Sequence, residues 1–237
     1  ARIVEINDAF SQITGYPREA VLGKSPAVLK SGHQGDEFYR AMWQSLLDNG
    51  HWAGEVWNRR RDGTVYAEHL TISAVRDDTG EVSHYVGIFT DITPFKEHEQ
   101  RLERIAHYDA LTGVPNRVLL ADRMAQATAQ TLRGGNLMAV CYLDLDGFKP
   151  VNDTLGHEAG DHVLVEMARR VKSCLRGGDT IARIGGDEFV VLLVGLKRIE
   201  ECEGALERIL AAIAQPVAIG DKQVGLSASL GVTLFPD

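Results

Sequence analysis

The alternation of apolar and polar residues predicts a small antiparallel sheet in the first half of the chain. Three strand-like runs lie at residues 52–58, 65–75 and 82–92. Asp62-Gly63 separates the first two and residues 78–80 separate the last two, and both separators are typical hairpin turns. The pattern therefore predicts three consecutive strands joined by short turns.

Helical spacing precedes these strands. Residues 36–47 are amphipathic, with Phe38, Met42 and Leu46 on one face. A short strand is expected at 3–6, followed by a short helix that Asn7 begins and Gly15 ends. Helices followed by an antiparallel sheet predict an α+β module.

A charged segment without glycine, residues 94–107, joins the two halves. Its apolar side recurs at steps of three and four residues, through Phe95, His98, Leu102 and Ile105. Two readings stay open at this point. The segment is either a surface helix that packs on its own domain or part of a dimeric coiled coil, and two heptads do not choose between them.

The second half alternates between helical and strand-like periodicity. Helices are expected at 118–132, 160–175 and 199–214, and strands at 137–143, 180–184 and 189–194. Residues 224–235 read as a strand pair or one long strand. From residue 137 the order is βαββαβ, so the whole chain is predicted to be α+β.

Composition restricts the functional classes. Of 237 residues, 44% are hydrophobic and 24% charged, which is typical of one or two globular domains. The net charge of −8 argues against nucleic acid as a partner, and no apolar run approaches a membrane span. Three scattered cysteines favour a reducing cytoplasm, with Cys141 in the core. The chain begins with Ala1 rather than Met, so we expect it to be a piece of a longer protein. Whether a membrane anchor precedes this piece is left open.

Two clusters of carboxylates and glycines carry the candidate chemistry. Asp144 and Asp146 end a buried strand and point to one face of it. The turn from Gly185 to Glu188 bears two more carboxylates, and its glycines allow a ligand to approach the backbone. If the two strands are neighbours, Asp144 and Asp187 converge and can hold Mg²⁺ for phosphoryl or nucleotidyl transfer. Taken singly, each cluster is also ordinary turn chemistry.

Four further residues are candidates for a nucleotide site. The amide of Asn152 and the carboxylate of Asp161 complement the donors and acceptors of a guanine edge. Lys149 and Arg183 are candidate contacts for phosphate oxygens. The alternative for Asn152 and Asp161 is helix capping.

The second half resembles the GGDEF family of diguanylate cyclases. Four collinear segments carry the resemblance: residues 109–117 (Asp-Ala-Leu-Thr-Gly-Val-Pro-Asn-Arg), 144–149 (Asp-Leu-Asp-Gly-Phe-Lys), 152–161, which begins Asn-Asp-Thr-Leu-Gly-His and ends Gly-Asp, and 183–189, which begins with Arg183 and ends Gly-Gly-Asp-Glu-Phe. The resemblance implies condensation of two GTP into cyclic di-GMP with release of two pyrophosphates, by two domains that face each other. It therefore also implies a homodimer.

The resemblance also implies roles for individual residues. Asp144, the Leu145 carbonyl and Asp187 would bind Mg²⁺, or Mn²⁺ in its place, and Glu188 would add a metal contact. Asp187, with Glu188 beside it, would be catalytic by activating the attacking hydroxyl. Guanine would be read by Asn152 and Asp161, and the substrate's phosphates would lie against Phe148, Lys149, Arg183 and Gly186.

An inhibitory site is implied as well. The segment from Arg176 to Asp179 matches the RxxD site of this family, at which product dimers bind, and Arg208 is a candidate secondary contact. Arginine can form paired hydrogen bonds with guanine or phosphate, and aspartate accepts from guanine N–H groups. The alternative is a solvated turn with a surface ion pair.

The first half resembles a PAS sensor domain. The matching stretches are residues 7–10 (Asn-Asp-Ala-Phe), 14–16 (Thr-Gly-Tyr), 58–63 (Asn-Arg-Arg-Arg-Asp-Gly) and 91–93 (Asp-Ile-Thr). The region from Trp52 to Asn58 is similar to flavin-binding PAS domains, so flavin is a candidate ligand. Compared with these families, the chain lacks a strand before Ala1 and a helix and strand after Asp237, so both ends are expected to be truncated.

We therefore expect a PAS sensor domain at 1–93, a signalling linker helix at 94–108 and a diguanylate cyclase domain at 109–237. The PAS domain and the cyclic di-GMP product are expected to regulate the cyclase. The alternative function is a non-catalytic module that binds GTP or cyclic di-GMP and controls an adjacent phosphodiesterase domain.

Overall fold

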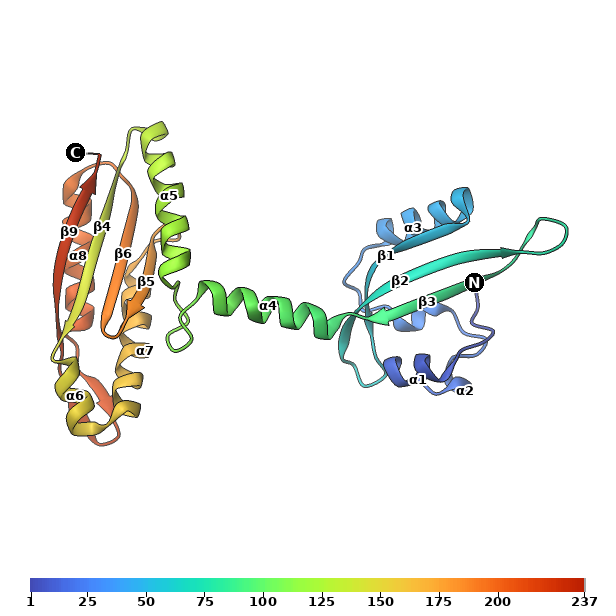
Figure 1. The fold of residues 1–237 in the computed structure, drawn as a ribbon, viewed down its shortest axis with the longest axis horizontal. Helices are drawn as coiled ribbons and strands as arrows, with labels where there is room; N and C mark the ends of the chain where they lie inside the picture. The colour runs from blue at the N-terminus through green and yellow to red at the C-terminus, as the bar shows by residue number, and fades with distance from the viewer. Residues whose placement is uncertain (237) are drawn as a thin grey trace. The chain divides into compact units, whose positions relative to one another are not determined.

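A computed structural model describes residues 1–236 and divides the chain into two compact units, Ala1–Gln100 and Arg101–Asp237. Each unit combines an antiparallel sheet with helices, which confirms the expected α+β class (Figure 1). The end of the expected cyclase domain, Asp237, lies outside the described residues. Within the described part of the chain, no helix has both the length and the apolar character needed to cross a membrane.

The first unit is built on the predicted three-stranded sheet, in the order β1-β2-β3. Antiparallel pairing places Val56 opposite Glu68 and Glu68 opposite Asp91. Asn7 begins α1 by accepting a hydrogen bond from the Phe10 amide, as expected. The elements are α1 (Asp8–Thr14), α2 (Arg18–Val21), the 3₁₀ helix η1 (Pro26–Leu29), α3 (Asp36–Asn49), β1 (His51–Arg59), β2 (Val65–Arg76) and β3 (Val82–Asp91).

The expected strand at residues 3–6 is wrong. This segment is irregular, and its backbone bonds run from the Ile3 amide to the Lys24 carbonyl and from the Gly23 amide to the Ile3 carbonyl. A strand needs a continuous partner strand, and a turn after α2 satisfies only one residue here.

Helix α4 (Thr93–His107) follows β3 and has no buried residue. Three of the four residues on its predicted apolar side are large hydrophobics, and they are exposed: Phe95, Leu102 and Ile105. The reading of α4 as a helix that packs its apolar side on its own domain is therefore wrong.

The second unit contains a four-stranded sheet in the order β5-β6-β4-β9 and a separate hairpin, β7-β8. The sequence pattern missed α6 and the hairpin. The long strand expected within residues 224–235 is present as β9, which begins at Ser227, whereas Val224 ends β8. The elements are α5 (Arg117–Gly134), β4 (Leu137–Asp146), α6 (Phe148–Leu155), α7 (His157–Cys174), β5 (Thr180–Gly185), β6 (Glu188–Leu196), α8 (Ile199–Ile213), β7 (Val217–Ile219), β8 (Lys222–Val224) and β9 (Ser227–Phe235).

Helices cover both faces of this sheet (Figure 1). On one face, Leu120 and Ala127 of α5 pack against residues such as Val190 and Leu192 of β6. On the other face, residues such as Cys141 and Leu143 of β4 join the core formed with α7 and α8. Burial of Cys141 is as expected. Because side chains alternate along a strand, Asp144 and Asp146 belong to the face that α5 covers only in part.

Candidate functional site

The end of β4 meets the turn between β5 and β6. β4 pairs with β6, and this register sets Asp144 directly opposite Glu188. Residues opposite each other in an antiparallel pair project from the same face, so the two carboxylates are cross-strand neighbours. Asp187 lies one residue before Glu188 in the turn that Gly186 forms with a positive φ of 53°. The structure thus confirms that the two predicted clusters lie on neighbouring strands.

The electrostatics of these carboxylates agree with this placement. The pKa of Asp144 is raised by partial desolvation and then by the negative charges of Asp187, Glu188 and Asp146. The Glu188 carboxylate also raises the pKa of the Tyr142 hydroxyl, which lies on the same face of β4. Like charges that converge favour the binding of a cation.

The donor set suits Mg²⁺ in a particular way. Among residues 1–236, no group of three or more His, Cys, Asp or Glu side chains could hold a metal ion on its own. Magnesium in proteins usually keeps water and phosphate ligands and takes one or two carboxylates. Asp144, Asp187 and the backbone carbonyl of Leu145, the residue after Asp144, fit such an incomplete site.

Asp146 has a different surrounding from Asp144. Its two carboxylate oxygens accept hydrogen bonds from Ser227 at 3.0 Å and Ser229 at 2.9 Å, both on β9. Asp146 therefore anchors the end of β4 to β9 beside the carboxylate cluster. Only the pairing of β4 with β9 could reveal this contact, because 81 residues separate Asp146 from Ser227.

Arg183 has partners other than the phosphates expected from the sequence. Its Nε and Nη2 donate to the Gly186 carbonyl at 3.0 and 2.8 Å, and its Nη1 donates to the Asp109 carboxylate at 3.0 Å. The arginine side chain is only 12% exposed. Arg183 therefore ties the segment after α4 to the turn that carries Asp187, and its role as a direct phosphate contact is corrected to that of a structural link.

The partners of Asp109 strengthen this link. Burial acts to raise the pKa of Asp109, but hydrogen bonds from Thr112 and the Arg183 guanidinium outweigh it and hold the pKa below its usual value. Asp109 begins the segment 109–117, the first of the four segments that resemble the GGDEF family. In the structure this segment holds Arg183 and, through it, the turn that carries Asp187.

Replacing Arg183 with alanine is expected to destabilise the second unit by about 2 kcal/mol, because a partly buried carboxylate and a carbonyl lose their donors. Urea unfolding followed by circular dichroism measures this. The matched control is Arg133→Ala, at an exposed position on α5. Equal losses of stability in the two variants would contradict the role given to Arg183.

The nucleotide candidates occupy the corner between α6 and α7. Asn152 lies on α6 and Asp161 on α7, and neither helix has a side-chain cap, so the capping alternative is wrong. Lys149 is exposed and has no polar partner within the described residues. Phe148 is 8% exposed and packs in the core, so only its backbone is available to phosphate.

The Arg176–Asp179 turn lines a cleft of about 370 Å³. One oxygen of Asp179 accepts from the Arg176 amide at 3.0 Å and the other from the Val194 amide at 3.1 Å. The Arg176 guanidinium, 70% exposed, lies 3.8 Å from Glu201 rather than pairing with Asp179. Arg208 does not line the cleft; its guanidinium donates to the Gly204 carbonyl on its own helix.

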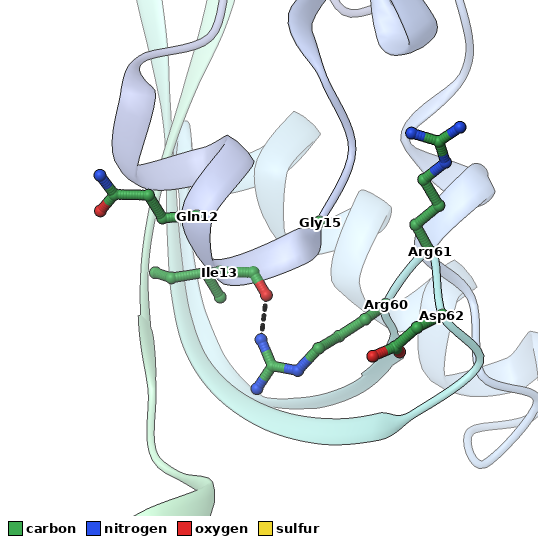
Figure 2. A pocket seen from close by; sticks show the side chains of 6 residues that line it. All are labelled: Gln12, Ile13, Gly15, Arg60, Arg61 and Asp62. Carbon is green, nitrogen blue, oxygen red and sulfur yellow. Dashed lines mark hydrogen bonds between the residues drawn. The ribbon is translucent and has the colours of Figure 1, made fainter.

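A second pocket, of about 510 Å³, lies on the first unit between α1 and the turn after β1 (Figure 2). The Arg60 side chain reaches across it and donates to the Ile13 carbonyl, whereas Arg61 points elsewhere. Arg60 also pairs with Asp91 at 2.5 Å. The tryptophans that suggested flavin pack on neighbouring rings, Trp52 on Phe38 and Trp57 on His33, so flavin stays a prediction.

Each half of the chain matches the model of a known protein family. Residues 106–237 match the model described as "Diguanylate cyclase, GGDEF domain", and residues 1–94 match a PAS domain model. MucR of Pseudomonas aeruginosa, a bifunctional diguanylate cyclase/cyclic di-GMP phosphodiesterase, is 43% identical over 144 residues, 61% of this chain and 21% of its own. An uncharacterized signaling protein of Caulobacter vibrioides is 35% identical over 245 residues, 100% of this chain and 29% of its own.

Solved structures agree with these matches. A sensory box/GGDEF family protein of Caulobacter crescentus is 39% identical with a TM-score of 0.53, over 55% of this chain and 85% of that one. The diguanylate cyclase SiaD of Pseudomonas aeruginosa, solved with its activator SiaC, is 37% identical with a TM-score of 0.53, over 60% of this chain and 54% of that one. The chain thus spans only 21% and 29% of the two curated relatives named above. It belongs to the GGDEF family of diguanylate cyclase domains and carries a PAS domain ahead of its GGDEF domain.

Proposed function

We propose that this chain condenses two molecules of GTP into cyclic di-GMP and releases two pyrophosphates. The observation that carries the proposal is the convergence of Asp144 with Glu188 and Asp187 at the edge of the β4–β6 pair. Diguanylate cyclase relatives such as TpbB, 37% identical over 143 residues, support the same reaction class.

The carboxylate cluster would act on the reacting phosphates. Asp144, Asp187 and the Leu145 carbonyl would hold Mg²⁺ or Mn²⁺, which neutralises phosphate charge and orients the in-line attack. Asp187 would accept the proton of the attacking 3′-hydroxyl, with Glu188 beside it. In each half-reaction the 3′-oxygen forms a bond to the α-phosphorus, and the bond from that phosphorus to pyrophosphate breaks.

The rest of the site would bind substrate. Asn152 and Asp161 would read the guanine base, and Lys149 would contact the phosphates with its free ammonium group. The backbone at Phe148 and Gly186 would approach the phosphates where no side chain intervenes.

Because one domain holds one GTP, the reaction requires two copies of the chain. The exposed apolar side of α4, formed by Phe95, Leu102 and Ile105, would pair the two linker segments, residues 94–108. A signal at the PAS domain, residues 1–93, would change this pairing and so the fraction of dimers whose sites face each other.

Product inhibition would act through the Arg176–Asp179 turn. The Arg176 guanidinium is exposed beside a cleft, which suits recognition of guanine or phosphate. The Asp179 carboxylate already holds two backbone amides, so we expect it to contribute mainly by shaping this turn. DgcB of Caulobacter crescentus, a structural neighbour at 26% identity and a TM-score of 0.55, was solved in complex with cyclic di-GMP.

A second function is favoured by the names of other relatives. NbdA of Pseudomonas aeruginosa, a cyclic di-GMP phosphodiesterase, is 38% identical over 136 residues, which are 17% of its length. In this alternative the domain binds GTP or cyclic di-GMP without turnover and regulates an adjacent phosphodiesterase.

Incubation of the chain with GTP and Mg²⁺, followed by chromatography, distinguishes the two functions. We expect cyclic di-GMP, at a specific activity that rises with protein concentration because the reacting species is a dimer. Binding of GTP without product, at concentrations at which the chain is a dimer, would favour the alternative.

A further inference from the structure

Gly160 lies in the second turn of α7 and is buried, although helix geometry does not require glycine there. Its φ is not positive, in contrast to Gly147 at 83° and Gly156 at 85° in the same corner. Glycine inside a helix is about 1 kcal/mol less favourable than alanine. The residue therefore needs an explanation other than backbone conformation.

The explanation is the side chain of Asn152. A Cβ atom at position 160 would lie 1.9 Å from Asn152 Oδ1 and 2.9 Å from its Cγ. Both separations are shorter than real Cβ atoms adopt, so the Asn152 side chain can lie against α7 only because Gly160 has no side chain.

The side-chain amide of Asn152 has no hydrogen-bond partner among residues 1–236. This side chain is half-buried, whereas the backbone carbonyl of Asn152 accepts from Gly156 at 2.9 Å. Asp161 follows Gly160 directly and is exposed. The Asn152 amide lies against Gly160, and the Asp161 carboxylate belongs to the next residue of α7; neither side chain has a hydrogen-bond partner among residues 1–236.

We infer that Gly160 is a specificity-determining positioning residue, which holds the Asn152 amide where it can hydrogen-bond to the guanine base. This inference rests on the proposed function, because it takes the base at this corner to be guanine. An alanine side chain at position 160 would rotate the amide away without touching the carboxylates proposed to bind the metal, Asp144 on β4 and Asp187 in the turn before β6.

The test is a four-variant cycle in the full chain: wild type, Gly160→Ala, Asn152→Ala and the double variant. The readouts are KM and kcat for GTP, the dissociation constant of 3′-deoxy-GTP, which lacks the attacking hydroxyl, and Tm. We expect Gly160→Ala to raise KM and the dissociation constant about tenfold, the loss expected for one or two hydrogen bonds, with a smaller change in kcat. In a chain that already carries Asn152→Ala, adding Gly160→Ala should change neither KM nor the dissociation constant of 3′-deoxy-GTP. It should raise Tm, because alanine favours the helix.

Gly204→Ala is the matched control. Gly204 is also helical, and a Cβ there would meet only Arg208 Nη1, at an ordinary 3.8 Å. This variant should leave KM unchanged.

Equal binding of 3′-deoxy-GTP by wild type and Gly160→Ala would overturn the inference while the proposed function stands. The inference would also be overturned if Gly160→Ala lowered the affinity for 3′-deoxy-GTP equally in the wild type and in Asn152→Ala, because Gly160 would then not act through Asn152. A wild-type chain that binds no guanine nucleotide would instead overturn the proposed function, and with it the role of Gly160.

Discussion

Replacing Asp187 with asparagine is expected to lower the rate of cyclic di-GMP formation by about 1000-fold or more. The substitution removes one of the two carboxylates assigned to the cation and also the group assigned to accept the hydroxyl proton, and each contributes several kcal/mol to such reactions. Initial rates of pyrophosphate release at saturating GTP and Mg²⁺ measure the loss.

Stability is expected to change in the opposite direction. The negative charge of Asp187 helps to raise the pKa of Asp144, so the uncharged amide relieves repulsion in the cation-free protein. Asp187→Asn should therefore unfold at the same urea concentration as wild type or a higher one. Asp122→Asn, at an exposed position on α5, is the control and should keep full activity. Activity of Asp187→Asn within tenfold of wild type would refute the assignment of the site.

The free energy of unfolding of the first unit is expected to fall by about 3 kcal/mol between pH 4.5 and pH 7. Glu68, on β2, is 2% exposed, and its pKa is raised from 4.5 to about 7, chiefly by desolvation. The folded state therefore binds the proton more tightly than the unfolded state does. This contribution to stability is complete below pH 4.5 and is lost as the pH rises to 7, at about 1.4 kcal/mol for each unit of pKa difference.

Several groups face Glu68, and the raised pKa already includes their opposing contributions. Tyr66 donates a hydrogen bond to one carboxylate oxygen at 2.8 Å and Asn58 to the other at 2.9 Å, and both favour the charged form. The negative charge of Asp91 opposes the charged form of Glu68. The positive charge of Arg60 favours that form, but with a smaller effect than Asp91 has, because Arg60 is already paired with Asp91. The Tyr39 hydroxyl, on α3, is buried without a hydrogen-bond partner among residues 1–236, and its pKa is raised by this burial and then by the charge of Glu68.

Tryptophan fluorescence measures this unit alone, because the three tryptophans, Trp43, Trp52 and Trp57, all lie in it. Urea titrations at several pH values should give a slope in wild type that Glu68→Gln removes. Glu81→Gln, in the exposed turn between β2 and β3, should keep the slope. An equal slope in wild type and Glu68→Gln would show that Glu68 does not cause it.

The periodic elements of this protein could be predicted because their signals are local. Helix α3 and strands β1 to β3 follow from apolar spacing and from Asp-Gly turns, which act over a few residues. Residues 3–6 show the limit of such signals, since an apolar run becomes a strand only when another strand lies beside it.

Within the candidate site, sequence alone identified the carboxylates but not their partners. Asp144 and Asp187 were named from strand-end and turn chemistry, whereas the register that sets Asp144 opposite Glu188 belongs to the β4–β6 pairing. Arg183 is a candidate phosphate contact by sequence because a guanidinium forms charge-assisted hydrogen bonds with phosphate oxygens. In the structure it donates instead to Asp109, 74 residues earlier. The contact of Asn152 with Gly160 likewise appears only when α6 and α7 meet. Residue chemistry and periodicity are properties of the chain, but the partner of a charged or amide group depends on which distant segment the fold places within about 3 Å of it.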